Sequence, residues 1–545
     1  MEPTLSPSAY TDTFARDHLP PPDQWPHLHF SLPELRYPDR MNCAEELLDR
    51  TIERHGTERP CIRGERESWT YGELRWLVDR AARVLTDELG VRPGNRVLLR
   101  GPNSPWLAAC WLAILKAGGI VVTVLPALRS GELTDILRSA RISHALCDAR
   151  FTDDLETAVD RAAPDLPVRT GITPYGSGRP DDLTARVAAA PGTPFPAFPA
   201  AADDVALIAY TSGTTGRPKG CVHFHRDVLA IADTFSAHVL RPHTDDLFVG
   251  SPPFAFTFGL GGLLVFPLRA GASTLLLEKA GPDRLLRAIE EDHATVVFTA
   301  PTAYRAMLGR AADANLSSRR RCVSAGEHLP AATWKAWLDA TGIRLIDGIG
   351  ATEMLHIFIS AADDDIRPGS TGIPVPGFTA AILDGKGDPV PDGQPGRLAV
   401  RGPVGCRYLA DDRQRRYVRD GWNITGDTYV RDADGYFWYR SRSDDMIVSA
   451  GYNIAAIEVE EVLMRAPQVA EVAVVGIPDP DRGQIVKAFV VPQDGVPATE
   501  DTADELKRFV TTEIAPYKAP RAVEFTRTLP RTPTGKLQRF KLREG

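Results

Sequence analysis

Short apolar runs and amphipathic segments alternate along most of the chain. Val205–Tyr210 is an apolar run of strand length, and from His225 onward apolar residues recur at helical spacing. The alternation continues with helices expected at 283–292, 302–310 and 331–341 and strands expected at 295–299, 321–325 and 343–346. Strands and helices in turn predict an α/β fold with mostly parallel sheets flanked by helices.

The pattern changes near residues 440–446. Beyond this point, helices are expected near 455–465 and 504–514, and strands near 469–476, 484–492 and 521–525. A unit of about 100 residues with this order of elements is α+β and large enough to fold on its own. We therefore predict a large N-terminal domain over 1–441 and a small C-terminal domain over 442–545. The proline-rich residues 1–40 are expected to wrap the surface as an extended arm.

Composition and charge exclude several classes of protein. The 545 residues are 43% hydrophobic and 25% charged, and a net charge of -8 disfavours nucleic acid or an anionic membrane as partner. No apolar stretch reaches the roughly 18–20 residues that a membrane span needs, and the N-terminus lacks the features of a signal peptide. Seven scattered cysteines with no Cys-x-x-Cys pair indicate reduced thiols and no zinc site. These features predict a cytoplasmic enzyme.

The most informative stretch is Tyr210–Gly220, which reads Tyr-Thr-Ser-Gly-Thr-Thr-Gly-Arg-Pro-Lys-Gly. A strand, then a loop of glycines and hydroxyl side chains, then a helix is an arrangement that holds polyphosphate. The loop is not of the Walker type, because Pro218 and Gly220 stand where that pattern needs Gly and Ser or Thr. The residues expected to contact the phosphates are Thr211, Ser212, Gly213, Thr214, Thr215, Gly216 and Lys219.

This stretch resembles the signature of the adenylate-forming superfamily, which contains acyl- and aryl-CoA synthetases, peptide-synthetase adenylation domains and beetle luciferases. Four more motifs of the superfamily follow in order: Gly350-Ala-Thr-Glu353, Thr425-Gly-Asp427, Arg442-Ser-Asp-Asp-Met-Ile447 and Pro533-Thr-Gly-Lys536. The resemblance implies a mobile C-terminal domain and a reaction in two halves. A carboxylate attacks the α-phosphate of ATP to give an acyl adenylate and pyrophosphate. A thiol, usually that of coenzyme A, then releases AMP.

The resemblance also implies roles for single residues. Lys536 would contact the carboxylate and the α-phosphate, Glu353 would bind Mg²⁺, and Thr352 lies in the same catalytic element. Further ATP contacts are expected from Gly326, Glu327, Asp347, Gly348, Asp427 and Arg442. Asp444 matches the hinge position. Gly451 matches the loop beside the pantetheine tunnel, where a missing side chain lets the thiol arm pass.

The segment after Glu353, Met354–Ile359, closely resembles that of benzoate- and 2-aminobenzoate-CoA ligases. In those relatives the acid pocket would map to Phe256, Thr257, Phe258, Ala325, Gly350, His356 and Ile357. Small residues at 325 and 350 leave room for a flat ring, and the Thr257 hydroxyl favours 2-aminobenzoate or salicylate over plain benzoate. Two alternatives stay open. Phe254, Phe256 and Phe258 alternate as on a core strand, and a lone histidine such as His356 is often a satisfied core residue.

Two departures from the superfamily pattern narrow the branch. Phe256 replaces the histidine that many members carry, and Ile349 replaces the usual adenine-stacking tyrosine. The benzoate-type branch shows both changes, so they do not argue against activity.

Several alternative functions need to be weighed. Glu290-x-x-His293 and Glu353-x-x-His356 mimic the ligand pairs of di-iron bundles, but the first precedes a strand and the second follows a glycine-rich turn. Closer alternatives keep the adenylation and transfer the acyl group to a carrier-protein thiol in trans, or use it in a luciferase-like oxygenation. The expected ligands are ATP, Mg²⁺, coenzyme A and a small aromatic acid. Nucleic acid and membrane are not expected, and a homodimer stays open.

Overall fold

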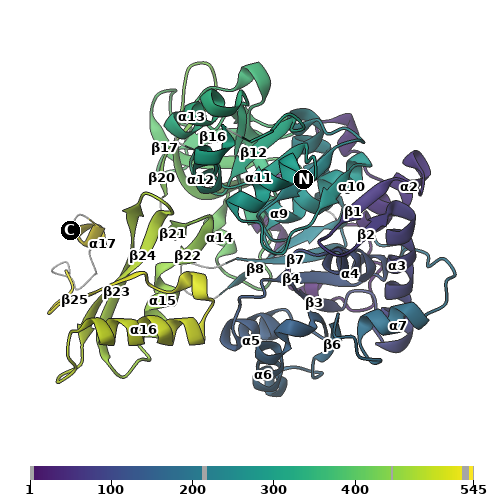
Figure 1. The fold of residues 1–545 in the computed structure, drawn as a ribbon, viewed down its shortest axis with the longest axis horizontal. Helices are drawn as coiled ribbons and strands as arrows, with labels where there is room; N and C mark the ends of the chain where they lie inside the picture. The colour runs from purple at the N-terminus through teal and green to yellow at the C-terminus, as the bar shows by residue number, and fades with distance from the viewer. Residues whose placement is uncertain are drawn as a thin grey trace.

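The computed structural model describes residues 5–211, 218–312, 314–329, 331–442, 446–530 and 539–543. Within this part of the chain, four β-sheets carry helices or pack on one another, and the C-terminal unit lies beside the larger N-terminal body (Figure 1). The predicted class, a large α/β portion followed by a small α+β portion, is confirmed.

A six-stranded sheet contains the start of the glycine-rich stretch. In spatial order its strands are β6 (Gly171–Tyr175), β5 (His144–Asp148), β3 (Arg96–Arg100), β4 (Ile120–Val124), β7 (Val205–Thr211) and β8 (Lys219–Phe224). All neighbours are parallel except β7 and β8. Its associated helices include α3 (Tyr71–Arg83), α4 (Pro105–Lys116), α5 (Ser130–Ser139), α6 (Thr152–Ala162), α7 (Leu183–Ala189) and α8 (His225–Ile231).

A nine-stranded sheet forms the second half of the N-terminal body. Its order is β15 (Ile373–Pro374), β14 (Ile357–Ser360), β13 (Leu345–Gly350), β12 (Arg321–Ala325), β11 (Val296–Thr299), β9 (Leu247–Gly250), β10 (Ser273–Leu275), β1 (Pro60–Arg63) and β2 (Ser68–Thr70). The six neighbouring strands from β13 to β1 are parallel. The helices α11 (Pro282–Glu290), α12 (Pro301–Ala311) and α13 (Ala331–Thr341) connect β10, β11, β12 and β13 along the chain. The predicted helices and strands of this region agree with the structure to within about two residues, except that the strand expected at 343–346 extends to Gly350.

An antiparallel sheet follows that the hydrophobic pattern did not predict. Its strands are β16 (Thr379–Leu383), β17 (Pro395–Arg401), β19 (Trp422–Arg431), β18 (Val418–Arg419) and β20 (Phe437–Arg442). Beyond it, the C-terminal unit contains β21 (Met446–Ser449), β22 (Tyr452–Ala455), β23 (Val469–Asp479), β24 (Gly483–Pro492) and β25 (Ala522–Phe525), with α15 (Ala456–Leu463), α16 (Glu500–Glu513) and α17 (Arg539–Arg543). The chain therefore changes sheets after Arg442, beside the predicted domain boundary.

The N-terminal arm is not a simple extended surface segment. It includes a short helix, α1 (Phe14–Asp17), and it inserts Tyr10, Trp25 and Leu35 into the hydrophobic core. The Tyr10 hydroxyl donates to the Val205 carbonyl over 3.0 Å. The arm is thus anchored at the start of β7, which leads to the glycine-rich stretch.

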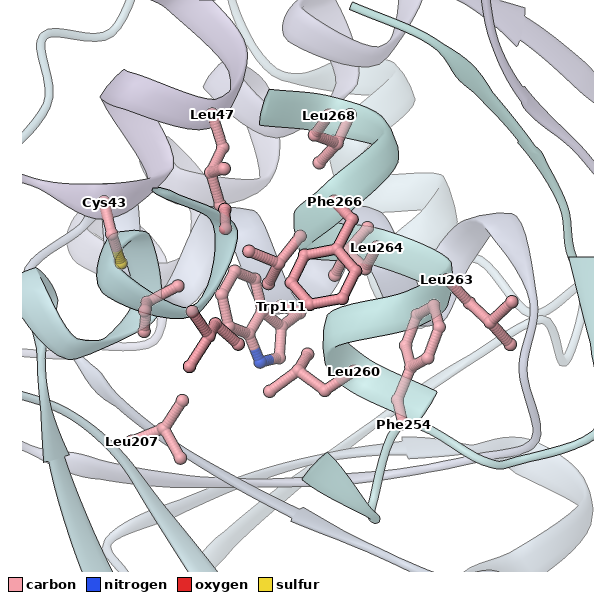
Figure 2. Packing of buried hydrophobic residues seen from close by; sticks show 14 of the residues in the cluster. Cys43, Leu47, Trp111, Leu207, Phe254, Leu260, Leu263, Leu264, Phe266 and Leu268 are labelled. Atoms are coloured by element: carbon pink, nitrogen blue, oxygen red, sulfur yellow. The ribbon is translucent and has the colours of Figure 1, made fainter. Parts of the chain in front are cut away.

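The core between the two large sheets is built around α4. Trp111 of this helix is fully buried, and Figure 2 shows Leu260, Leu264 and Phe266 close to its indole. These residues come from a helical run formed by α9 (Thr257–Leu260), residues 261–265 and α10 (Phe266–Ala270). Burying one such side chain contributes about 1.5–3 kcal/mol. The same run supplies Thr257 and Phe258 to the candidate site, so core packing fixes their position.

Candidate functional site

Two adjoining cavities lie between the N-terminal body and the C-terminal unit. The larger has a volume of about 1090 Å³ and the smaller about 520 Å³. Gly326 and Gly350 line both cavities, so only residues without side chains stand at this part of the wall between them. A ligand with two dissimilar parts could occupy both cavities at once.

The residues predicted for the aromatic acid all face the larger cavity. They are Phe256, Thr257, Phe258, Ala325, Gly350, His356 and Ile357. Ala325 ends β12 and Gly350 ends β13, so both lie at the carboxyl edge of parallel strands, where open α/β sheets bind ligands. A Cβ on Gly350 would lie 2.9 Å from the His356 carbonyl carbon, so the tight return from β13 into β14 requires glycine.

The alternating phenylalanines do not form a strand. Phe254 lies in an irregular segment and is only 2% exposed, in the core, whereas Thr257 begins α9. A Cβ on Gly259 would lie 2.3 Å from the Pro253 carbonyl oxygen, so the helix packs closely on the preceding Pro-Pro turn. The core-strand alternative is therefore wrong. This turn directs Phe256 and Phe258 to the cavity and Phe254 into the core.

His356 is almost fully buried. Its side chain is 2% exposed, and neither ring nitrogen makes a hydrogen bond of regular geometry among the described residues, although the Phe258 backbone interacts with the ring. Its ring centroid lies 4.6 Å from that of Phe266 and 5.7 Å from that of Phe258. Burial lowers the pKa of His356 to about 3, so the imidazole is neutral at neutral pH. His356 lines the larger cavity, and its role in the acid pocket stays a prediction.

A buried ion pair lies next to the cavity. Lys219, the first residue of β8, donates to Glu353 Oε1 over 2.9 Å and to the Tyr408 hydroxyl over 2.5 Å, and Tyr408 donates to the same Glu353 oxygen. Burial alone would raise the pKa of Glu353, but the Lys219 charge and the two hydrogen bonds outweigh it and hold that pKa below its ordinary value. The pair is therefore charged at neutral pH.

The sequence interpretation of the phosphate stretch needs one correction. The helix α8 does not follow the glycine-rich stretch directly, because β8 intervenes and pairs antiparallel with β7. On its other side β8 exchanges backbone hydrogen bonds with residues far along the chain: Val222 N–H donates to the Arg407 carbonyl over 2.8 Å, and the Gly220 carbonyl accepts from Leu409 N–H over 2.9 Å. Local periodicity cannot reveal a strand that long-range pairing stabilises.

Several predicted residues cannot be placed. Ser212, Gly213, Thr214, Thr215, Gly216, Asp444 and Lys536 lie outside the described residues. Thr211 and Thr352 line the larger cavity. Arg442 is described by its backbone alone, which pairs with Asp427 between β20 and β19.

The other predicted ATP contacts face the smaller cavity. They are Gly326, Glu327, Asp347, Gly348 and Asp427. Burial raises the pKa of Asp347 well above its ordinary range. Sequence reasoning missed two aromatic residues of this wall, Tyr429 and Tyr439, which pair across β19 and β20 with ring centroids 5.5 Å apart. In the sequence, Tyr429 could have been found only from its place two residues after Asp427, and Tyr439 only from its place on the strand that pairs with it.

The C-terminal unit closes one side of the larger cavity. The turn between β21 and β22 places Gly451 there with φ +82°, and a Cβ on this residue would lie 3.6 Å from that of Ala300. A Cβ on Gly451 would also lie 4.0 Å from a carboxylate oxygen of Glu327, which lines the smaller cavity. The turn therefore links both cavities to the C-terminal unit.

A parallel-sheet body, a smaller C-terminal unit and two joined cavities between them define an adenylate-forming type of enzyme. The chain belongs to the AMP-binding enzyme family, whose model matches residues 48–408, and the AMP-binding enzyme C-terminal domain matches residues 458–536. No described helix has the length and hydropathy to cross a membrane.

Three similar proteins illustrate the range of the family. The 3-hydroxybenzoate–CoA ligase of Aromatoleum sp. (strain CIB) is 32% identical over 521 residues, which cover 92% of this chain and 97% of that protein. The structure of the anthranilate CoA ligase AuaEII with anthranoyl-AMP has a TM-score of 0.71 at 34% identity and covers 94% of this chain and 98% of that one. The amide bond synthetase McbA from Marinactinospora thermotolerans has a TM-score of 0.83 at 29% identity, with coverages of 92% and 99%. The predicted enzyme class, an acid–thiol ligase, is confirmed at this level.

Proposed function

We propose that the protein is an ATP-dependent aryl-CoA ligase. It activates an aromatic carboxylic acid as the acyl adenylate with release of pyrophosphate, and then transfers the acyl group to coenzyme A with release of AMP. The observation that carries the proposal is the pair of cavities that share Gly326 and Gly350, one walled by phenylalanines and the other by Asp347, Asp427 and two tyrosines. An aryl adenylate has one part suited to each.

Charge placement supports the first half-reaction. The carboxylate of the acid must approach the negatively charged phosphates of ATP. A fixed positive charge where the two cavities meet therefore lowers the activation barrier of adenylation. Lys219 supplies such a charge next to Thr211 and Thr352, and we assign Lys536 to the same step by resemblance. The acid and the nucleotide would bind in their separate cavities with the reacting groups at the glycine wall.

A magnesium ion fits the site only as part of a nucleotide complex. The described residues contain no group of three or more His, Cys, Asp or Glu side chains arranged for a metal. Glu353 is one ionised carboxylate, and Mg²⁺ is commonly bound by one or two carboxylates plus phosphate oxygens. Bound there, Mg²⁺ would neutralise phosphate charge. We therefore keep Glu353 as the magnesium residue.

The best candidate for the acid is 2-aminobenzoate, followed by salicylate and benzoate. The similar proteins include an anthranilate and a 3-hydroxybenzoate ligase. The pocket offers a ring substituent two polar groups among apolar walls, the Thr257 hydroxyl and the neutral His356 imidazole. Because both are uncharged, they suit an amino or hydroxyl substituent and not a second carboxylate.

Product analysis tests this proposal. The enzyme is given ATP, Mg²⁺, coenzyme A and equimolar 2-aminobenzoate, salicylate, benzoate, 4-hydroxybenzoate and octanoate, and the products are identified by mass spectrometry. A dominant 2-aminobenzoyl-CoA peak supports the assignment. Octanoyl-CoA as main product would contradict the aromatic pocket.

The ring-substituent contact is tested by Thr257→Ala, with Thr257→Ser as the control that keeps the hydroxyl. Losing one hydrogen bond worth about 1 kcal/mol should lower the selectivity for 2-aminobenzoate over benzoate roughly fivefold. An unchanged ratio of the two kcat/KM values would reject the contact.

The identity of the acceptor is less well supported than the adenylation step. McbA, an amide bond synthetase, has a TM-score of 0.83 to this chain. An amine is therefore the second candidate acceptor, and the carrier-protein thiol considered from the sequence stays an alternative. An aryl adenylate that accumulates despite coenzyme A, and is consumed by an added amine, would favour the amine. A cytoplasmic location, a mobile domain over 442–545 and a homodimer stay predictions.

A further inference from the structure

A cluster of three buried charges joins the C-terminal unit to the N-terminal body. The Lys518 ammonium donates to Glu132 of α5 and to Glu458 of α15. Lys518 is 5% exposed, and each glutamate is 8% exposed. Glu132 also accepts the Ala515 N–H over 3.0 Å, so two groups of the 515–518 segment meet one carboxylate across the junction. None of these residues belongs to the superfamily motifs described above.

The contact between Glu132 and Lys518 depends on how the C-terminal unit is oriented relative to the N-terminal body. A buried charge without its partner costs about 3–5 kcal/mol, so Glu132 and Lys518 are best satisfied when the two parts meet in this arrangement. Burial raises the pKa of Glu458, and the neighbouring Lys518 charge opposes this rise. Glu132 and Glu458 both accept a hydrogen bond from the Lys518 ammonium. Glu132 lies in the N-terminal body, whereas Glu458 and Lys518 lie in the C-terminal unit.

The cluster is connected to the turn at the cavity wall by stacked rings. Tyr517, next to Lys518, stacks on Tyr452 with centroids 4.1 Å apart. Tyr452 meets Phe256 of the acid pocket edge to face at 5.8 Å, and it directly follows Gly451. Glu132, Glu458, Tyr517 and Lys518 also line the larger cavity. Fixing Lys518 against α5 therefore fixes where the Gly451 turn stands relative to Ala300 and the acid.

We propose that Glu132 is a positioning residue for the acceptor step: through Lys518 it holds the Gly451 turn beside the acyl group while the acceptor enters. This inference rests on the two-step function proposed above. The first half-reaction does not need the turn there, because it joins only the acid and ATP. Loss of the contact should thus slow acyl transfer and spare adenylate formation.

The test separates the two half-reactions in Glu132→Gln. Glutamine preserves the shape and the cap of α5, where Glu132 accepts the Arg129 N–H over 3.0 Å, but it removes the charge facing Lys518. Adenylation is measured as pyrophosphate release in a single turnover without coenzyme A, and transfer as decay of the preformed adenylate after coenzyme A is added. The amide oxygen of glutamine can keep the bonds that Glu132 Oε2 accepts, but the NH2 group then faces the Lys518 ammonium and cannot accept from it. Losing this charged hydrogen bond should slow transfer roughly tenfold or more and change adenylation less than about twofold.

The control is Glu156→Gln, the same change at an exposed position of the neighbouring helix α6, which should leave both rates unchanged. Lys518→Met should reproduce the selective loss from the other side of the contact. Equal losses in both half-reactions, or no loss of transfer, would overturn the inference. If the unmodified enzyme forms no adenylate with any acid, the proposed function itself fails.

Hydrogen–deuterium exchange tests whether Glu132 positions the Gly451 turn, and it does not depend on a measured enzyme activity. In Glu132→Gln, exchange should rise at the Ala515 amide and in the β21–β22 hairpin, while α4 in the core stays protected. Unchanged exchange in the hairpin would show that the contact does not hold the turn, whatever the reaction proves to be.

Discussion

The buried imidazole of His356 leads to a quantitative prediction about stability and pH. His356 has an ordinary pKa of 6.5 when exposed and a pKa of about 3 in the folded chain. Between these values the unfolded chain binds a proton that the folded chain does not, so stability falls as the pH falls below 6.5. At 1.36 kcal/mol per pKa unit, the full difference is about 5 kcal/mol, reached only below pH 3. At pH 5 the loss from this residue is about 2 kcal/mol.

The perturbation is His356→Leu, assayed by reversible urea unfolding at pH 8 and pH 5 with tryptophan fluorescence. At pH 8 leucine replaces a neutral ring whose nitrogens make no hydrogen bond of regular geometry, so the variant should lie within about 1 kcal/mol of the unmodified protein. Between pH 8 and pH 5 the variant should lose about 2 kcal/mol less. Other groups with depressed pKa values, such as His225 at about 4, are present in both proteins and cancel.

His29→Leu serves as the control, because it makes the same replacement at a ring that is exposed in the folded chain. The same loss of stability in His356→Leu and in the unmodified protein would refute the reasoning. It would mean that the imidazole is hydrated or charged in the folded protein, and the pocket would then not be the neutral one proposed for a ring substituent.

Three further substitutions test other parts of the site. Gly261→Ala places a Cβ 2.4 Å from the buried imidazole and should raise KM for the acid, whereas Gly309→Ala, with open space around it, should not; equal KM values would contradict this contact. Tyr408→Phe removes a charged hydrogen bond worth about 1.5–3 kcal/mol, so pyrophosphate release should slow roughly 10–100-fold, and an unchanged rate would show that the hydroxyl is dispensable. Gly451→Ala should slow acyl transfer measured from preformed adenylate, while Gly435→Ala, which also has positive φ but nothing nearby, should affect only stability; equal transfer rates in the two variants would remove the turn from the acceptor path.

Much of the fold could be predicted because its strands are short apolar runs set between amphipathic helices. β11, for example, reads Val-Val-Phe-Thr and is buried throughout, and α11 has a clear apolar face. The antiparallel sheet from β16 to β20 was missed, because strands such as β19 mix polar and apolar residues and are stabilised by cross-strand pairing. β8 was missed for the same reason.

The candidate site could be predicted where a motif or a close family likeness marks it. Glu353 and Asp427 fall in such motifs, and the seven residues assigned to the acid all face one cavity. Tyr408 could not be found in this way, since its hydroxyl meets Lys219 only after β8 pairs with residues 407–409. The Glu132–Lys518 contact spans 386 positions, and no local pattern in the sequence relates the two residues.

The side-chain-free wall at Gly326 and Gly350 bears on how the intermediate is retained. In the proposed reaction, the acid and the nucleotide enter as two separate ligands, and each binds in one of the two cavities. Once joined, they form a single tethered ligand, and an end that detaches rebinds at an effective concentration in the millimolar range or above. Escape then requires both ends to let go together. An aryl adenylate that spans both cavities would therefore dissociate more slowly than either substrate alone, and would stay bound until the acceptor takes the acyl group.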